Sequence, residues 1–258
     1  MDVNYDLTLD RVAEDRQQTR IDMAAAFRQA VNDDFHEGIS NHFTCNVPGR
    51  PGRFYVNSYG LHWSEVTASS LIEVSYDGEI VGGTGIADET AVCIHGPIHR
   101  LIPEAVCVMH THMPYCTALS QLEDMTLEPT GQTALYFQDR IAYDYNYNGW
   151  ADDLAEGERL AGLMQGKPIL MLANHGVVVT GSSVASAYYR LYYLERACRT
   201  QMFSMWTQQP RRFVKPEIAA KIAAQLKKPA PSLKMSSADY MFNAFKRSLD
   251  RNQPNYVL

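Results

Sequence analysis

The sequence predicts a protein of the mixed α/β class in which antiparallel strands are combined with long helices. Two segments, residues 9–34 and 182–206, carry apolar residues at the spacing of an amphipathic helix, and several short segments between them are rich in β-branched and aromatic residues. With 258 residues, of which 46% are hydrophobic, the chain can bury a full core. Its length fits one large domain or two small ones.

The N-terminal third predicts a long helix followed by antiparallel strands. The helix covers residues 9–34, and we expect Gly38 to end it by adopting a positive φ. Strands are expected in residues 42–47, 53–57 and 71–81. The last of these contains Asp77-Gly78, a dipeptide that favours a tight hairpin turn.

The rest of the chain predicts further helices and strands. Because Pro97 would break a helix interior, we expect the helix around residues 91–101 to be short and to start near that proline. The remaining expected elements are a strand at 105–109, a helix after Pro114, a helix at 152–166, strands at 168–174 and 176–181, and helices at 182–206 and 237–250. We expect residues 1–210 to form the main domain, with residues 211–258 as an extension that packs on it or on a neighbouring subunit.

Composition excludes several classes of partner. The formal net charge is -6 and the basic residues are scattered, so we expect no binding to nucleic acid. No run of about twenty apolar residues occurs, so no membrane span is expected. The N-terminus is acidic and polar, unlike a signal peptide. The five cysteines are odd in number and form no Cys-x-x-Cys pair, which favours reduced thiols in the cytoplasm.

Three histidines predict a metal site. His110 and His112 stand one residue apart at the end of an apolar strand, so both imidazoles can point to the same face, about 7 Å apart along the backbone. His175 ends another apolar strand and precedes Gly176, which allows a sharp turn. Three neutral imidazoles leave an open position on Zn²⁺ or a similar ion, as in catalytic sites. The alternative is three histidines that only make hydrogen bonds in the core or at caps, and the combined pattern favours the metal.

Four blocks of this sequence occur in the order found in the class II aldolase/adducin family, which the region from about residue 20 to residue 205 resembles. They are "EGISNHFTCNVPG", "VNSYGLHWSEVTASSLIEVSYDG", "IHGPIHRLIPEAVCVMHTHMPYCTALS" and "LANHGVVVTGSSVASAYYRLYYLERA". The family includes sugar-phosphate aldolases, epimerases, decarboxylases and the cytoskeletal protein adducin. The resemblance implies a three-layer α/β/α fold with a central, mostly antiparallel sheet. It also implies a homotetramer with active sites at subunit boundaries.

The resemblance assigns the metal ligands to His110, His112 and His175. All three are present, unlike in adducin itself. The ion implied is Zn²⁺, with Mn²⁺, Co²⁺ or Ni²⁺ as substitutes.

The family's catalytic base is not found at its own position. The aldolases carry a Ser-Ser-Glu triplet ahead of a histidine, which here is His95, fifteen residues before His110. The triplet then falls on Glu89, Thr90 and Ala91, so that Ala91 replaces the family's glutamate. Glu89 becomes the candidate catalytic residue, and the alternative is a solvated loop carboxylate.

The resemblance also implies substrate-binding residues. Asn41 matches an asparagine that the aldolases direct at substrate, and Tyr59 and Gly60 lie where those enzymes have Pro-Ser-Gly. Thr90 keeps a hydroxyl in the triplet. Taken singly, Asn41 and Gly60 are also typical of turns.

The predicted function is that of a metal-dependent carbon–carbon lyase, of the aldolase or decarboxylase type, acting on a small hydroxy-carbonyl or carboxylate substrate through an enediolate. Because Glu89 and Tyr59 replace serines that hold phosphate in the family, we expect a substrate without a phosphate. An epimerase uses the same intermediate and stays an alternative. A binding or scaffold protein of the adducin type is the alternative without catalysis.

Overall fold

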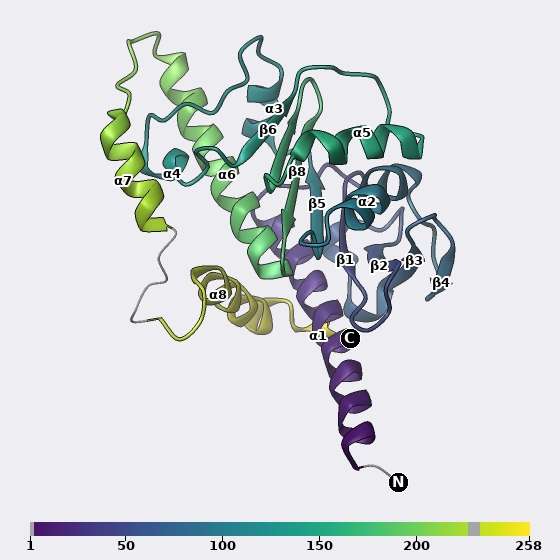
Figure 1. The fold of residues 1–258 in the computed structure, drawn as a ribbon. Helices are drawn as coiled ribbons and strands as arrows, with labels where there is room; N and C mark the ends of the chain where they lie inside the picture. Colours follow the sequence, from purple (N-terminus) through teal and green to yellow (C-terminus); the bar gives the residue numbers. More distant parts are fainter. Residues whose placement is uncertain (1–2, 227–232) are drawn as a thin grey trace.

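A single eight-stranded sheet forms the centre of the computed structural model, which describes residues 3–226 and 233–258 (Figure 1). The strands lie in the order β4-β3-β2-β1-β5-β8-β7-β6. Their bounds are β1 His42–Asn46, β2 Arg53–Asn57, β3 Leu71–Ser75, β4 Ile80–Gly82, β5 Cys107–Thr111, β6 Ile141–Asp144, β7 Ile169–Leu172 and β8 Gly176–Gly181. Neighbouring strands are antiparallel except β6 and β7, which are parallel. The prediction of a mostly antiparallel sheet is confirmed.

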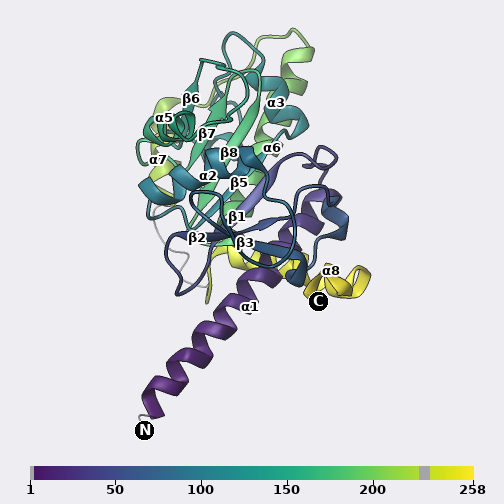
Figure 2. The same ribbon diagram turned by 90° about the vertical axis from the view of Figure 1, so that its right-hand side faces the viewer.

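Helices cover both faces of the sheet, so the molecule has three layers. The helices are α1 Val3–Asn32, α2 Glu89–Leu101, α3 Pro114–Ser120, α4 Gln132–Leu135, α5 Leu154–Met164, α6 Val184–Trp206, α7 Pro216–Leu226 and α8 Ser237–Asn252. Short 3-10 turns occur at η1 Trp63–Glu65, η2 Ala68–Ser70 and η3 Pro254–Val257. Figures 1 and 2 show α2 and α5 on one face and α6 with the C-terminal part of α1 on the other. The predicted α/β/α architecture is therefore confirmed.

The alternation of side chains along the central strands decides which residues face which helices. On β5, Cys107 and Met109 belong to the core formed with α1 and α6, whereas Val108 belongs to the core formed with α2 and α5. On β1, Phe43 faces the first core, and His42 contacts a side chain of α2. Side chains along a strand alternate between the two faces of the sheet, and His42 pairs with His110 across β1 and β5. Both histidines therefore lie on the α2 side of the sheet.

The end of α1 differs from the expectation. The helix ends at Asn32, six residues before Gly38, and Asp34 takes the positive φ of 60° that ends it. The amide of Phe35 donates to the carbonyl of Ala30 at 2.9 Å, which is the six-residue bond of a Schellman motif. An aspartate therefore occupies the left-handed position that glycine usually fills in this motif.

Helix α2 corrects the expectation of a short helix beginning near Pro97, because it runs unbroken from Glu89 to Leu101 with the proline inside. Pro97 has no N–H group to donate to the carbonyl of Cys93 one turn earlier. That carbonyl lies against α5 at Gly157. A Cβ on Gly157 would stand 1.8 Å from that oxygen, so only glycine permits this approach. The neighbouring helix thus accommodates the interruption that the proline makes.

Two helices and one strand were not expected, the four-residue helix α4 among them. Strand β6 is only four residues long, and α7 lies in the C-terminal segment where a single helix was predicted. Helix α8, predicted at residues 237–250, is present, and its Phe242 and Leu249 are buried in the core that also contains α1 and α6. The division into residues 1–210 and 211–258 stays a prediction.

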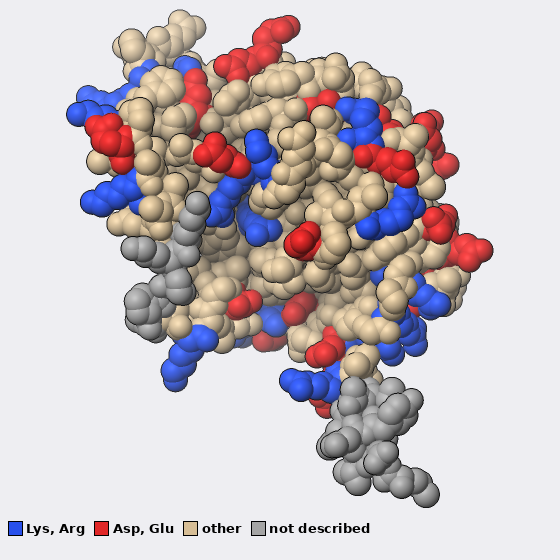
Figure 3. Space-filling model, viewed as in Figure 1, with Lys and Arg blue, Asp and Glu red and all other residues tan. Residues whose placement is uncertain are grey.

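The surface is mixed in charge. On the face shown in Figure 3, Lys and Arg side chains are interspersed with Asp and Glu side chains. This distribution agrees with the net charge of -6 and gives no support to a nucleic-acid interface on that face. Among residues 3–226 and 233–258, no helix is long and apolar enough to cross a bilayer.

Candidate metal centre and active site

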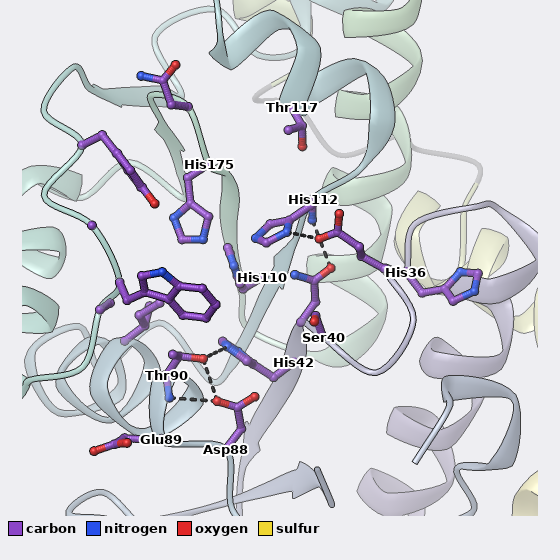
Figure 4. Close-up of a pocket in the computed structure, with 18 of the residues that line it drawn as sticks. His36, Ser40, His42, Asp88, Glu89, Thr90, His110, His112, Thr117 and His175 are labelled. Atoms are coloured by element: carbon purple, nitrogen blue, oxygen red, sulfur yellow. Dashed lines mark hydrogen bonds and ion pairs between the residues drawn. The ribbon is translucent and has the colours of Figure 1, made fainter. Parts of the chain in front are cut away.

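The three predicted histidines converge at one end of β5 and β8. His110 lies in β5, His112 follows its end, and His175 lies in the turn before β8. Their ligand nitrogens all lie within 4.8 Å of one another (Figure 4). Gly176 allows this convergence, since a Cβ there would stand 2.5 Å from the carbonyl oxygen of Thr111. The fold therefore brings together His110 and His175, which are 65 positions apart in the sequence.

Hydrogen bonds orient two of the imidazoles so that their Nε2 atoms are free. The Nδ1–H of His110 donates to the carbonyl of Val177 at 3.0 Å, and Nδ1 of His112 pairs with the carboxylate of Glu37. The Nε2 atom of His112 is buried and has no hydrogen-bond partner in the described structure. A buried nitrogen without a partner, next to two further imidazoles, fits a divalent metal ion.

Burial keeps the imidazoles of His110 and His175 neutral, which is the form that binds metal. Burial and the neighbouring His175 hold the pKa of His110 well below its ordinary value of 6.5. Burial, followed by the influence of His112, lowers the pKa of His175 to about 4. The rings of His110 and His175 are therefore neutral at neutral pH, the protonation state that binding to a metal ion requires.

A cavity of about 950 Å³ opens in front of the three histidines. The described residues that line it include three carboxylates, Glu37, Asp88 and Glu89, and neither Lys nor Arg. Tyr147 and Trp150 also contribute to its wall, and Trp150 is 82% exposed. The chain thus provides a pocket rich in hydrogen-bond acceptors and poor in cations.

The structure places the predicted acid/base residue at the rim. Glu89 is the first residue of α2 and is exposed, and Figure 4 shows its side chain directed away from the three histidines. Asp88, which the sequence did not single out, caps α2 and accepts hydrogen bonds from the amide and hydroxyl of Thr90 at 2.9 and 2.7 Å. Asp88 carries no sequence signal beyond the preference for aspartate at a helix N-cap.

The predicted substrate-binding residues are only partly brought together. Thr90, Asn41 and Tyr59 line the cavity, whereas Gly60 does not. Asn41 is buried with a φ of 72°, and its Oδ1 accepts the amide of His112 at 3.2 Å, so it also supports a proposed metal ligand. Gly60, with a φ of 93°, provides the turn behind Tyr59.

His42 is a second residue that the sequence did not single out. It lines the cavity, its ring centroid lies 5.1 Å from that of His110, and its Nδ1 is 3.0 Å from Nε2 of His95. His95 and His99 share one face of α2, but both contact Thr44 of β1 instead of the metal site. Two sequence features could have predicted this cluster: His42 and Thr44 alternate in a strand and so share one face, and His95 and His99 are four residues apart in a helix.

We expect the free energy of unfolding to decrease as the pH falls from about 6.5 to 4. Burial lowers the pKa of His99 from 6.5 to about 4, so between these values the unfolded chain binds more protons than the folded one. The stabilising contribution is fully present above pH 6.5 and is lost toward pH 4, at up to about 1.4 kcal/mol per pH unit for one group. Urea unfolding at several pH values measures this slope. His99→Gln should make the slope less steep by the share of this one histidine, while the control His62→Asn, at a partly exposed position, should leave it unchanged. An unchanged slope in His99→Gln contradicts the assignment.

The sequence and the fold agree with those of one known family. The sequence model of the Class II Aldolase and Adducin N-terminal domain matches residues 21–202. A protein from Caulobacter vibrioides is 31% identical over 81% of this chain and 81% of its own length. Its name assigns it provisionally as an aldolase class 2 protein. Mouse alpha-adducin is 33% identical over 75% of this chain, which spans only 27% of that protein.

A solved structure extends the likeness to the whole fold. The aldolase II superfamily protein from Pseudomonas syringae is 33% identical, has a TM-score of 0.87, and covers 96% of this chain and 98% of its own. The resemblance that the four sequence blocks predicted is thereby confirmed. The chain belongs to the class II aldolase and adducin family.

Proposed function

We propose that this protein is a metal-dependent carbon–carbon lyase, of the aldolase or decarboxylase type, that acts on a small hydroxy-carbonyl or carboxylate substrate without a phosphate. The observation that carries the proposal is the convergence of His110, His112 and His175 within 4.8 Å, with a buried Nε2 that lacks a partner. A protein that only served as a scaffold has no need of such a group.

Some of these residues bind the ion, and others contact the substrate. His110, His112 and His175 hold the ion, while the Val177 carbonyl and Glu37 orient the first two rings. A divalent ion such as Zn²⁺ supplies, when bound, a Lewis acid that polarises a substrate carbonyl. The open cavity beside the three histidines leaves room for two substrate oxygens.

A carboxylate at the start of α2 is proposed to transfer the proton. Glu89 is the residue predicted from the sequence, but it is exposed and directed away from the metal site. Asp88 lies in the cavity wall beside Thr90 and retains a second carboxylate oxygen beyond the one that accepts the Thr90 hydrogen bonds. The geometry favours Asp88, and Glu89 is the alternative.

We expect Asp88→Asn to lower turnover about 10²- to 10⁴-fold, the usual effect of losing a general acid or base. Asparagine still caps a helix, so α2 should remain folded. Glu89→Gln is the matched control, with an expected change of less than about threefold because an exposed carboxylate has little influence across water. Steady-state kinetics of the two variants decide between the residues, since the reverse order of effects assigns the role to Glu89.

The absence of cations from the described cavity wall supports a substrate without a phosphate. A phosphate dianion beside Glu37, Asp88 and Glu89 would be repelled by a few kcal/mol at the effective dielectric of a half-buried site. No Lys or Arg of the described chain lines the cavity to offset this.

We therefore expect each unphosphorylated candidate substrate to be turned over at least about tenfold more efficiently than its phosphate ester. The comparison uses kcat/KM values measured on the same metal-loaded preparation, with the unphosphorylated form as the reference in each pair. More efficient turnover of the ester would overturn this part of the proposal and indicate that cations reach the site from elsewhere.

Three further possibilities follow from the family: an epimerase, a homotetramer and an adducin-type scaffold. An epimerase shares the intermediate and would be recognised by a product of unchanged mass.

A homotetramer with sites at subunit boundaries is supported by Trp150, which lines the cavity although 82% of it is exposed. The adducin-type scaffold stays the alternative without catalysis because of the likeness to alpha-adducin, and metal-dependent turnover would exclude it as the full function.

A further inference from the structure

Four buried polar side chains form a continuous hydrogen-bonded chain beside the metal site. His42 and Thr44 come from β1, and His95 and His99 come from α2; each is at most 3% exposed. Nδ1 of His42 lies 3.0 Å from Nε2 of His95, and the Thr44 hydroxyl lies 2.8 Å from both Nδ1 of His95 and Nε2 of His99. The chain ends where Nδ1 of His99 lies 2.7 Å from the carbonyl oxygen of Ala105.

The carbonyl at one end fixes the direction of every bond in this chain. Because the Ala105 oxygen can only accept, His99 must carry its proton on Nδ1 and present a lone pair on Nε2. Thr44 therefore donates to His99 and accepts from Nδ1–H of His95. His95 in turn presents its Nε2 lone pair to Nδ1–H of His42. This reasoning holds for neutral rings, and burial lowers the pKa values of His42 and His99 to about 4 and that of His95 well below 6.5.

The last nitrogen, Nε2 of His42, is left as an acceptor that faces the cavity. Its neighbour is the Thr90 hydroxyl at 3.2 Å, but the single proton of that hydroxyl is donated to Asp88 at 2.7 Å. A hydrogen bond to a carboxylate is the stronger of the two. Nε2 of His42 therefore lacks a donor within the described part of the chain.

We propose that this chain holds His42 as a hydrogen-bond acceptor and that His42 selects substrates with a hydroxyl donor next to the group that binds the metal. The ring centroid of His42 lies 5.1 Å from that of His110, so the hydroxyl would sit at the edge of the metal site. An oxygen without a hydrogen would meet only acceptors there, His42 and Asp88. The identity of the bound molecule rests on the proposed function, whereas the tautomer of His42 does not.

The first test is the tautomer itself, read by ¹⁵N NMR of histidine-labelled, zinc-loaded protein. Couplings between ring nitrogens and carbon-bound ring protons distinguish a protonated Nδ1 from a protonated Nε2, and a His42→Gln spectrum assigns the signal. We expect His42 to carry its proton on Nδ1. A proton on Nε2 would overturn the inference.

Thr44→Val gives a sharper test, because it removes the link to the Ala105 carbonyl and keeps the β-branched shape. Without that link, His95 can donate from Nε2 to His42, which would then carry its own proton on Nε2 and donate to Thr90. We expect this switch in Thr44→Val and not in Thr44→Ser, which retains the hydroxyl. Thr90→Val should also leave the proton on Nδ1. Should Thr44→Val fail to fold, the wild-type and Thr90→Val spectra still decide, and an unswitched Thr44→Val refutes the role of the chain.

The selection of a hydroxyl is tested with glycolate and acetate, which differ by one hydroxyl group. Isothermal titration calorimetry on zinc-loaded protein gives the ratio of the two affinities. We expect Thr44→Val to lower the preference for glycolate about fivefold, the effect of one hydrogen bond, and Thr44→Ser to preserve it. An equal ratio in all three proteins overturns the selection. If no lyase activity is found but the tautomer and the ratio behave as expected, only the proposed function fails.

Discussion

Replacing His175 with alanine should abolish metal binding. Two imidazoles do not hold a divalent ion tightly, and changes that only touch the neighbours of metal ligands already cost about 10- to 100-fold in affinity. We expect a loss of more than about 100-fold, so that bound zinc falls from about one ion per chain to a trace. His175 is half-buried, and its imidazole makes no hydrogen bond in the described structure, while its backbone amide donates to the Leu172 carbonyl at 3.2 Å. Because truncation to alanine keeps that backbone bond, the fold should stay intact.

Elemental analysis of the purified variants checks this prediction. His62→Asn is the matched control, because His62 lies outside the cavity and asparagine can replace its capping interaction. Glu37→Gln should give an intermediate loss, about 10- to 100-fold, since glutamine orients His112 without a full charge. Unchanged zinc content in His175→Ala would remove the metal assignment.

Replacing Gly157 with alanine should destabilise the protein by about 3 kcal/mol or more. The added Cβ would stand 1.8 Å from the Cys93 carbonyl and 2.8 Å from Cγ of Pro97, and neither can move unless α2 and α5 separate. Because α2 also carries Thr90 and His95, the separation should disturb the wall of the cavity as well.

Gly162→Ala is the matched control in the same helix. No atom lies within 4 Å of a Cβ built at Gly162, so alanine should stabilise α5 by about 0.5 to 1 kcal/mol through its higher helix propensity. Urea unfolding of both variants gives the two free energies. If the two substitutions had similar effects, the close approach of α2 and α5 at Gly157 would be wrong.

The parts that sequence predicted are those fixed by local periodicity. His110 and His112 point to one side because a strand alternates every two residues, and Asp77-Gly78 makes the β3–β4 hairpin with Gly78 at a φ of 97°. His175 was found because Gly176 follows it, and that glycine is needed where the turn meets Thr111.

The parts that sequence did not predict depend on contacts between distant elements. The contacts of His42 are set by the pairing of β1 with β5 and by the packing of α2 on β1, neither of which a local pattern reveals. Pro97 was expected to limit α2, but the approach of Gly157 lets the helix continue. Glu89 was chosen by counting along the chain. Both Glu89 and Asp88 line the cavity, but the helix that starts at Glu89 directs its side chain away from the three histidines.

The most direct test of a metal-dependent lyase at this site is mass spectrometry of the products formed from hydroxy-keto acids and sugar acids. Zinc-loaded wild-type protein should convert at least one of them into two smaller fragments, or into carbon dioxide and a product that is one carbon shorter. His175→Ala should form neither product. Zinc-loaded protein that cleaves no substrate in the set, or a His175→Ala variant that forms the same products at the same rate, would contradict the proposed function.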